Sequence, residues 1–71
     1  MLLTLRHIVS VDPRIRSFWD RRKFVTRTVA EYRGDDGETY RKSFEAVGTP
    51  KVPEAGTHAE INALRTQWRD N

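Results

Sequence analysis

Residues 12–23 hold the side chains of this chain that are best suited to bind an anionic polymer. This run contains five of the thirteen Lys and Arg residues, interleaved with Ile15, Phe18 and Trp19. Asp followed by Pro favours a helix start, because Asp accepts hydrogen bonds from free backbone N–H groups and Pro fits the first turn. Ile15, Phe18 and Trp19 then share one helix face. The pattern predicts a short helix over residues 13–23 with an apolar inner face.

The other face of this predicted helix carries Arg14, Ser17 and Arg21. Arg donates hydrogen bonds in a planar fork that matches phosphate oxygens, so such a row suits nucleic acid. An α-helix also fits the major groove of duplex DNA, where Arg can bind guanine. The competing interpretation is a solvated charged surface, with Phe18 and Trp19 serving as core residues and not as platforms for bases.

A β-hairpin is expected to supply further basic side chains. Residues 24–33 are rich in β-favouring types, residues 34–37 (Gly-Asp-Asp-Gly) form a turn, and residues 38–47 alternate between two faces. Basic residues on this hairpin would contact the phosphate backbone or the minor groove. The predicted nucleic-acid-binding residues are Arg14, Ser17, Arg21, Lys23, Arg27, Arg33, Arg41 and Lys42.

Charge is distributed unevenly along the sequence. The net charge is +3, with eight Lys and Arg against three acidic residues in residues 1–33, and five against seven in residues 34–71. Such asymmetry places a positive field on one part of the fold. The partner that it favours is a polyanion or an acidic protein surface.

Catalysis has little support in the sequence. The chain has no Cys, and His7 and His58 are far apart without motif partners. Asp35 and Asp36 resemble a metal-binding pair, but no acidic ligands follow at calcium-loop spacing, and a tight turn uses the same residues. We therefore predict no enzyme activity, no metal and no cofactor.

The N-terminal segment, residues 2–10, fits two kinds of element. Leu5, Ile8 and Val9 have the spacing of a helix face, whereas Leu3, Leu5, Val9 and Val11 fit a strand, and a short apolar run does not separate the two. We predict a short helix here.

The C-terminal part is expected to form a loop and one more helix. Residues 48–56 contain two Pro and two Gly and are predicted to be a loop. Thr57 and Glu60 have capping-box spacing, which predicts a helix over residues 58–69. Its narrow apolar stripe would be Ile61, Leu64 and Trp68.

Size and hydropathy indicate one small soluble domain covering residues 1–71. No apolar run approaches the about 18 residues that a membrane span needs. The first residues lack the basic region and cleavage site of a secretion signal. Together with the absence of Cys, these features predict a cytoplasmic protein.

Three short blocks resemble small phage excisionases of the lambda type, which are winged-helix, DNA-bending recombination directionality factors. The blocks are residues 1–5 (Met-Leu-Leu-Thr-Leu), Arg16-Ser17-Phe18 with Arg21-Arg22, and residues 36–40 (Asp-Gly-Glu-Thr-Tyr) followed by Ala46-Val47. More loosely, residues 23–71, with Arg41-Lys42-Ser43-Phe44 at the end of a hairpin, are similar to the arm-type DNA-binding domains of tyrosine recombinases. Both resemblances imply binding to DNA in site-specific recombination.

The sequence thus predicts a small α+β domain with a winged-helix-like arrangement. Two short N-terminal helices would precede a β-hairpin, a loop over residues 48–56 and a C-terminal helix. The predicted function is that of a DNA-binding accessory protein, with duplex DNA and a recombinase or other protein as partners. The alternative is a phage- or mobile-element-encoded inhibitor or adaptor that docks on an acidic protein.

Overall fold

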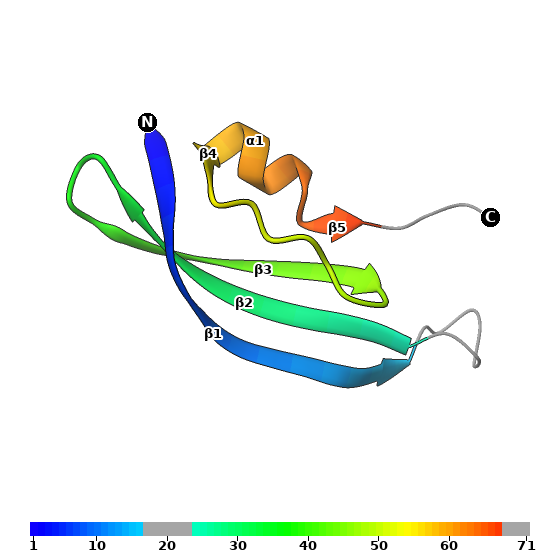
Figure 1. Cartoon of the computed structure of the whole chain (residues 1–71). Coiled ribbons are helices and arrows are strands. Elements are labelled where there is room, and N and C mark those ends of the chain that lie inside the picture. Colours follow the sequence, from blue (N-terminus) through cyan, green and yellow to red (C-terminus); the bar gives the residue numbers. More distant parts are fainter. Residues whose placement is uncertain (17–23, 68–71) are drawn as a thin grey trace.

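The computed structural model describes residues 1–16 and 24–67, with side chains at residues 1–13 and 25–67. Three long antiparallel strands follow each other in the chain (Figure 1): β1 (Leu2–Arg16), β2 (Phe24–Gly34) and β3 (Thr39–Val47). Three short elements complete the fold: β4 (Ala55–Thr57), α1 (His58–Ala63) and β5 (Thr66–Gln67).

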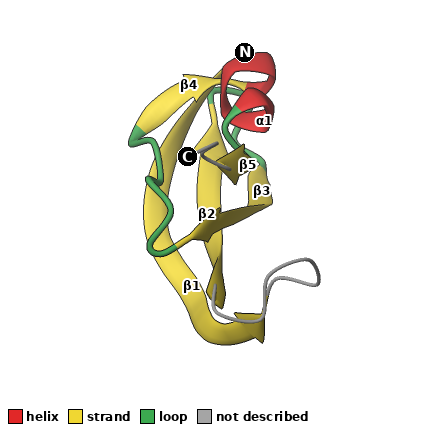
Figure 2. Ribbon diagram, turned by 90° about the vertical axis from the view of Figure 1, so that its right-hand side faces the viewer, coloured by secondary structure: helices red, strands yellow, loops and turns green. Residues whose placement is uncertain are grey.

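These strands form one curled sheet with the order β4-β1-β2-β3-β5. β4 pairs antiparallel with the first residues of β1, and β5 pairs parallel with the end of β3. α1 connects β4 and β5 and lies over one face of the sheet (Figure 2). The fold is therefore mostly β, and the predicted winged-helix-like α+β arrangement is wrong.

Both predicted N-terminal helices are wrong where the structure describes them. Residues 2–10 and residues 12–16 lie in the single strand β1, which pairs with β2 from Leu3↔Gly34 to Arg16↔Phe24. The helical spacing of the apolar residues is overridden by this long-range pairing, to which Ile and Val are well suited. Pro13 is tolerated because the β1–β2 register shifts between Asp12 and Ile15.

The predicted β-hairpin is confirmed, with β2 and β3 within one residue of the expected limits. Gly37 has a φ of 84°, which an L side chain rarely adopts. Asp36 Oδ1 accepts a hydrogen bond from the Glu38 amide at 3.0 Å. Turn chemistry therefore accounts for Asp36, as expected from the sequence.

The predicted C-terminal helix begins as expected but ends early. Thr57 and Glu60 form the predicted capping box, and α1 starts at His58. The helix ends at Ala63 and not at residue 69, because the backbone then turns to pair with β3, where the Glu45 amide donates to the Arg65 carbonyl at 2.7 Å. The β3–β5 pairing thus ends the helix before the end of the helical pattern in the sequence.

One compact cluster forms the core between the sheet and α1. Its members are fully buried: Leu3, Ala30, Tyr32, Phe44 and Ile61. Alternation along β2 explains why Ala30 and Tyr32 are in this core: Thr28, Ala30 and Tyr32 point toward α1, while their neighbours point to the other face. Ile61 anchors α1 to the sheet, which a helix of six residues needs, because such a short helix is not stable alone.

Candidate nucleic-acid interface and polar groove

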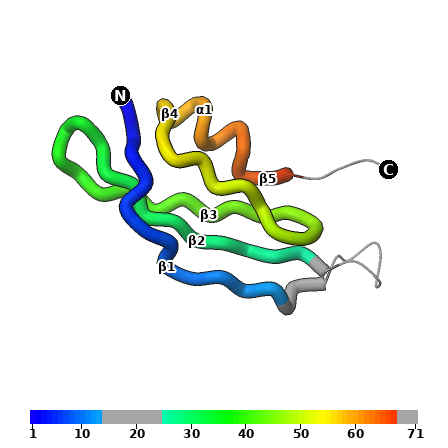
Figure 3. Tube along the Cα trace, in the orientation of Figure 1, coloured from blue at the N-terminus to red at the C-terminus, as the bar shows by residue number. Residues whose placement is uncertain are grey.

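β1 and β2 run side by side from the end of the sheet with the β2–β3 turn toward its opposite end (Figure 3). β3 pairs with β2 from Thr26 to Arg33, and Val25 forms a bridge with Gly48. At this end of β2, Phe24 alone among the described residues therefore pairs with β1 without a partner on its other side. Arg14 and Arg16 belong to the last three residues of β1, and Arg16 pairs with Phe24. Arg14 therefore belongs to a strand, and its predicted place on a helix is wrong.

Residues 17–23 connect Arg16 to Phe24 and lie outside the described residues. Three predicted site residues fall there: Ser17, Arg21 and Lys23. Their sequence still determines where the net charge lies along the chain, since residues 14–23 contain five Lys and Arg and only one acidic residue. The rest of the chain has eight Lys and Arg against nine acidic residues. The positive excess of the protein is thus carried by residues 14–23.

The sheet face turned away from α1 carries a row of ion pairs, which we call the charged face (Arg6, Arg27, Glu31, Arg41 and Glu45). Arg27 Nε lies 2.7 Å from Glu45 Oε1, and Arg41 Nε lies 3.6 Å from Glu31 Oε2. Arg6 Nη1 approaches Glu31 Oε1 at 3.9 Å. Cross-strand register produces this row, because Arg27 faces Glu45 and Glu31 faces Arg41 in the β2–β3 pairing.

The structure divides the predicted phosphate-binding residues of the hairpin between the two faces of the sheet. Arg27 and Arg41 lie on the charged face, where carboxylates compensate their charge. Arg33 is exposed opposite Thr39 and joins no ion pair among the described residues. Lys42 points to the α1 side and donates from Nζ to Asn62 Oδ1 at 2.9 Å. By the alternation along β2 and β3, Arg27, Arg33 and Arg41 share the sheet face turned away from α1, and Lys42 lies on the opposite face.

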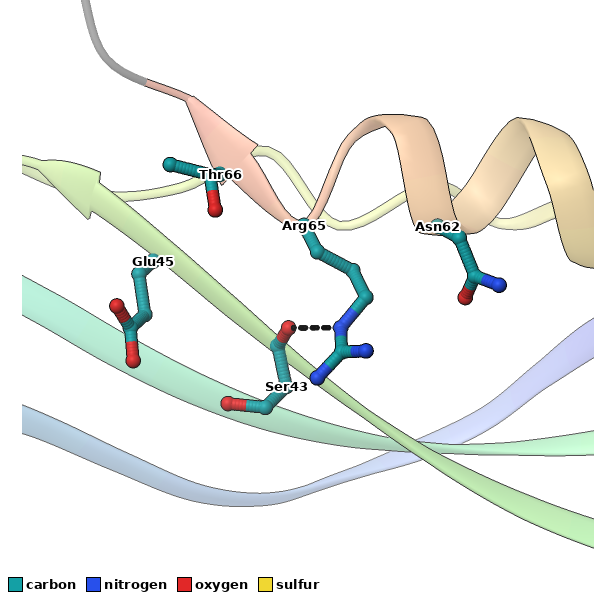
Figure 4. A pocket seen from close by; sticks show the side chains of 5 residues that line it. All are labelled: Ser43, Glu45, Asn62, Arg65 and Thr66. Carbon is teal, nitrogen blue, oxygen red and sulfur yellow. Dashed lines mark hydrogen bonds between the residues drawn. The ribbon is translucent and has the colours of Figure 1, made fainter.

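A polar groove of about 470 Å³ lies between β3 and the segment that follows α1 (Figure 4). Its lining residues are Ser43, Glu45, Asn62, Arg65 and Thr66. Arg65 donates from Nε to the Ser43 carbonyl oxygen at 3.1 Å, which satisfies a backbone acceptor on the outer edge of β3. The sequence interpretation missed this groove, because it depends on the early end of α1 and on the β3–β5 pairing.

A third polar cluster sits at the β2–β3 turn. Tyr40 donates its hydroxyl to Asp36 Oδ2 at 2.6 Å, and the Tyr40 ring packs edge-on against His58 with centroids 4.7 Å apart. The hydrogen bond from Tyr40, followed by that from the Glu38 amide, lowers the pKa of Asp36. The same bond raises the pKa of Tyr40. These contacts fasten the turn to the start of α1.

Comparisons with protein-family models, with curated proteins and with solved structures found no match to this chain. The resemblance to excisionases therefore remains a prediction, and the fold that it implied is not the one observed. Within residues 1–16 and 24–67, no helix has the length and apolar character needed to cross a membrane.

Proposed function

We propose that this chain is a small cytoplasmic protein that binds duplex DNA through the far end of the β1–β2 hairpin. The observation that carries the proposal is the position of the basic run. Pairing of Arg16 with Phe24 puts Arg14 and Arg16 at the end of the β1–β2 hairpin, and the positive excess of the chain belongs to residues 14–23.

A two-stranded ribbon suits duplex DNA by shape. The major groove is about 12 Å wide and admits an α-helix or a two-stranded β-ribbon. Proteins that read DNA with strands place them in the major or the minor groove. In this proposal the end of the β1–β2 hairpin contacts DNA, where the sequence had predicted a helix over residues 13–23 to do so. The expected partner is still duplex DNA.

Charge compensation elsewhere supports this choice of surface. On the charged face, Arg27 and Arg41 would have to leave Glu45 and Glu31 before they could neutralise a phosphate. Exposed ion pairs contribute only about 0–1 kcal/mol, so this rearrangement costs little free energy, but each separated pair leaves a carboxylate that repels the phosphate. We therefore rank the basic run of residues 14–23, which has five Lys and Arg and one acidic residue, above Arg27 and Arg41 as the contact to DNA.

The test is the salt dependence of binding to a fluorescent duplex. Each lost phosphate contact should reduce the slope of log K against log salt by about 0.9. Arg14→Ala/Arg16→Ala should lower the slope by about 1.8 and weaken binding at low salt. Arg27→Ala/Arg41→Ala is the matched control, since it removes the same charge from the charged face and should change the slope less.

A second candidate function, a protein-binding module, is favoured by the outer edge of β1. β4 covers only Leu2–Thr4 of that strand, and Ile8, Val9 and Val11 are exposed beyond it. An extended peptide can add a strand to such an edge. Of the apolar stripe predicted for the C-terminal helix, Ile61 is buried in the core, Leu64 is exposed just after α1, and Trp68 lies outside the described residues. Failure of the wild-type chain to bind random duplex DNA at low salt would favour this second function, as an inhibitor or adaptor.

A further inference from the structure

The polar groove contains more hydrogen-bond donors than its surroundings use. Arg65 commits only Nε to the Ser43 carbonyl oxygen, so its two Nη groups have no protein partner within the described ranges. The Ser43 and Thr66 hydroxyls, which also line the groove, are likewise without a protein partner there. A guanidinium with two free Nη groups beside two hydroxyls is a suitable donor set for an anion with several oxygens.

A second cation stands beside the groove. Lys42 donates from Nζ to Asn62 Oδ1 at 2.9 Å, and Asn62 lines the groove. This contact occupies the oxygen of the Asn62 amide and leaves its N–H₂ group as a donor. Lys42 thus adds a second positive charge next to Asn62, one of the lining residues of the groove that also contains Arg65.

Glu45 is the acidic residue in the lining, and on its own it would repel an anion. Its carboxylate, however, lies 2.7 Å from Arg27 Nε. Arg27 belongs to β2, which pairs with one edge of β3, whereas Arg65 directly precedes β5, which pairs with the other edge. The ion pair compensates the Glu45 charge and leaves the groove with a positive excess. Arg27 therefore affects the groove without being one of its lining residues.

We propose that this groove binds a compact oxyanion of the phosphate monoester class. A phosphate monoester carries a charge of about −1.5 to −2 at neutral pH and offers three strong acceptor oxygens. Two cations and several donors match it better than a carboxylate with one charge or a phosphodiester with one charge. The volume of about 470 Å³ leaves room for a small organic group attached to the phosphate. This proposal does not rest on the proposed binding to DNA.

The first experiment titrates the full chain with inorganic phosphate and follows the amide signals by NMR. We expect saturable shifts at Ser43, Asn62 and Thr66 with a Kd on the order of 1 mM. Arg65→Gln should weaken binding by about tenfold or more, because it removes a charged donor. Lys51→Gln is the control, since it removes an exposed positive charge outside the groove and should leave the Kd unchanged. Shifts that stay linear, or an effect of Lys51→Gln equal to that of Arg65→Gln, would overturn the proposal.

The second experiment tests the charge balance around Glu45. Arg27→Gln should weaken phosphate binding severalfold although Arg27 does not line the groove, because Glu45 is then uncompensated. Glu45→Gln should strengthen binding, and Arg27→Gln/Glu45→Gln should bind at least as tightly as the wild type. Equal affinity of Arg27→Gln and wild type would contradict the role given to this ion pair.

A third arm separates the possible sources of the phosphate. A short duplex without terminal phosphates should not compete with inorganic phosphate for the groove, whereas a nucleoside monophosphate should. Competition by the duplex would assign the groove to the DNA backbone and overturn its assignment to monoesters. Arg14→Ala/Arg16→Ala should bind inorganic phosphate like the wild type, so failure of the DNA proposal and failure of this one give different results.

Discussion

At the scale of single residues, the buried hydroxyl of Tyr32 shows how a polar atom can serve this small core. Tyr32 is fully buried beside Phe44, with ring centroids 6.2 Å apart, and donates its hydroxyl to the Pro53 carbonyl oxygen at 2.6 Å. The bond connects the loop between β3 and β4 to the C-terminal part of β2. Burial raises the pKa of Tyr32 to about 12, because the phenolate would lose its hydration.

This raised pKa predicts a loss of stability at alkaline pH. The neutral phenol is favoured in the folded state, so the contribution of Tyr32 is complete below the ordinary Tyr pKa of about 10 and disappears as the pH rises toward 12. Tyr32→Phe should lower the unfolding free energy by about 1–2 kcal/mol at neutral pH, since the Pro53 carbonyl loses its partner. Tyr32→Phe should also reduce the drop in unfolding free energy between neutral and alkaline pH.

Urea denaturation at about pH 8 and pH 11 measures both effects, at pH values on either side of the ordinary Tyr pKa. Tyr40→Phe is the matched control, because Tyr40 bonds to Asp36 at the turn and lies outside the fully buried core. That variant should keep the alkaline loss that comes from Tyr32. If Tyr32→Phe loses as much stability at high pH as the wild type, Tyr32 is not its source.

At the scale of elements, local sequence signals correctly predicted the β2–β3 hairpin and the start of α1. The other elements depend on long-range strand pairing, which the sequence does not show. The β2–β3 hairpin has its turn residues and alternation within one short stretch, so the sequence was sufficient. The start of α1 was equally accessible through Thr57 and Glu60. β1 could not be predicted, because the spacing of its apolar residues also fits a helix and only the pairing with β2 makes it a strand. The end of α1 at Ala63 was also hidden, because it depends on β5 pairing with β3.

The capping box offers a prediction at this scale. Thr57 Oγ1 accepts the Glu60 amide at 3.2 Å, and Glu60 Oε1 accepts the Thr57 amide at 3.1 Å. Thr57→Ala should therefore destabilise the protein by about 1 kcal/mol in urea denaturation. Thr57→Ser keeps the hydroxyl and should retain most of the stability. Equal losses in the two variants would mean that the methyl group, and not the cap, matters.

Of the candidate site, the sequence located the basic run but not its geometry. Arg14 was expected on a helix and lies on a strand. Arg27 and Arg41 were expected to face DNA, and their pairing with Glu45 and Glu31 becomes visible only once β2 and β3 are aligned. The polar groove had no sequence signal, because its lining residues come from two segments that are joined only by the fold.

At the scale of the whole molecule, the fold separates charge along its length. Ion pairs compensate the middle of the sheet, Asp35, Asp36 and Glu38 gather at the β2–β3 turn, and the basic run belongs to the opposite end of β2. Such a distribution would orient the protein as it approaches DNA, because a polyanion attracts one end and repels the other. Orientation by charge also predicts that binding weakens steeply with salt.

The most direct test of this account is an NMR titration of the full chain with duplex DNA at low and moderate salt. We predict that the largest amide shifts fall on residues 14–16 and 24–25 at the far end of the β1–β2 hairpin. The amides of the β2–β3 turn, including Gly37, should move little. Largest shifts on the charged face or at the turn, or no shifts at low salt, would contradict the proposal that the far end of the β1–β2 hairpin binds DNA.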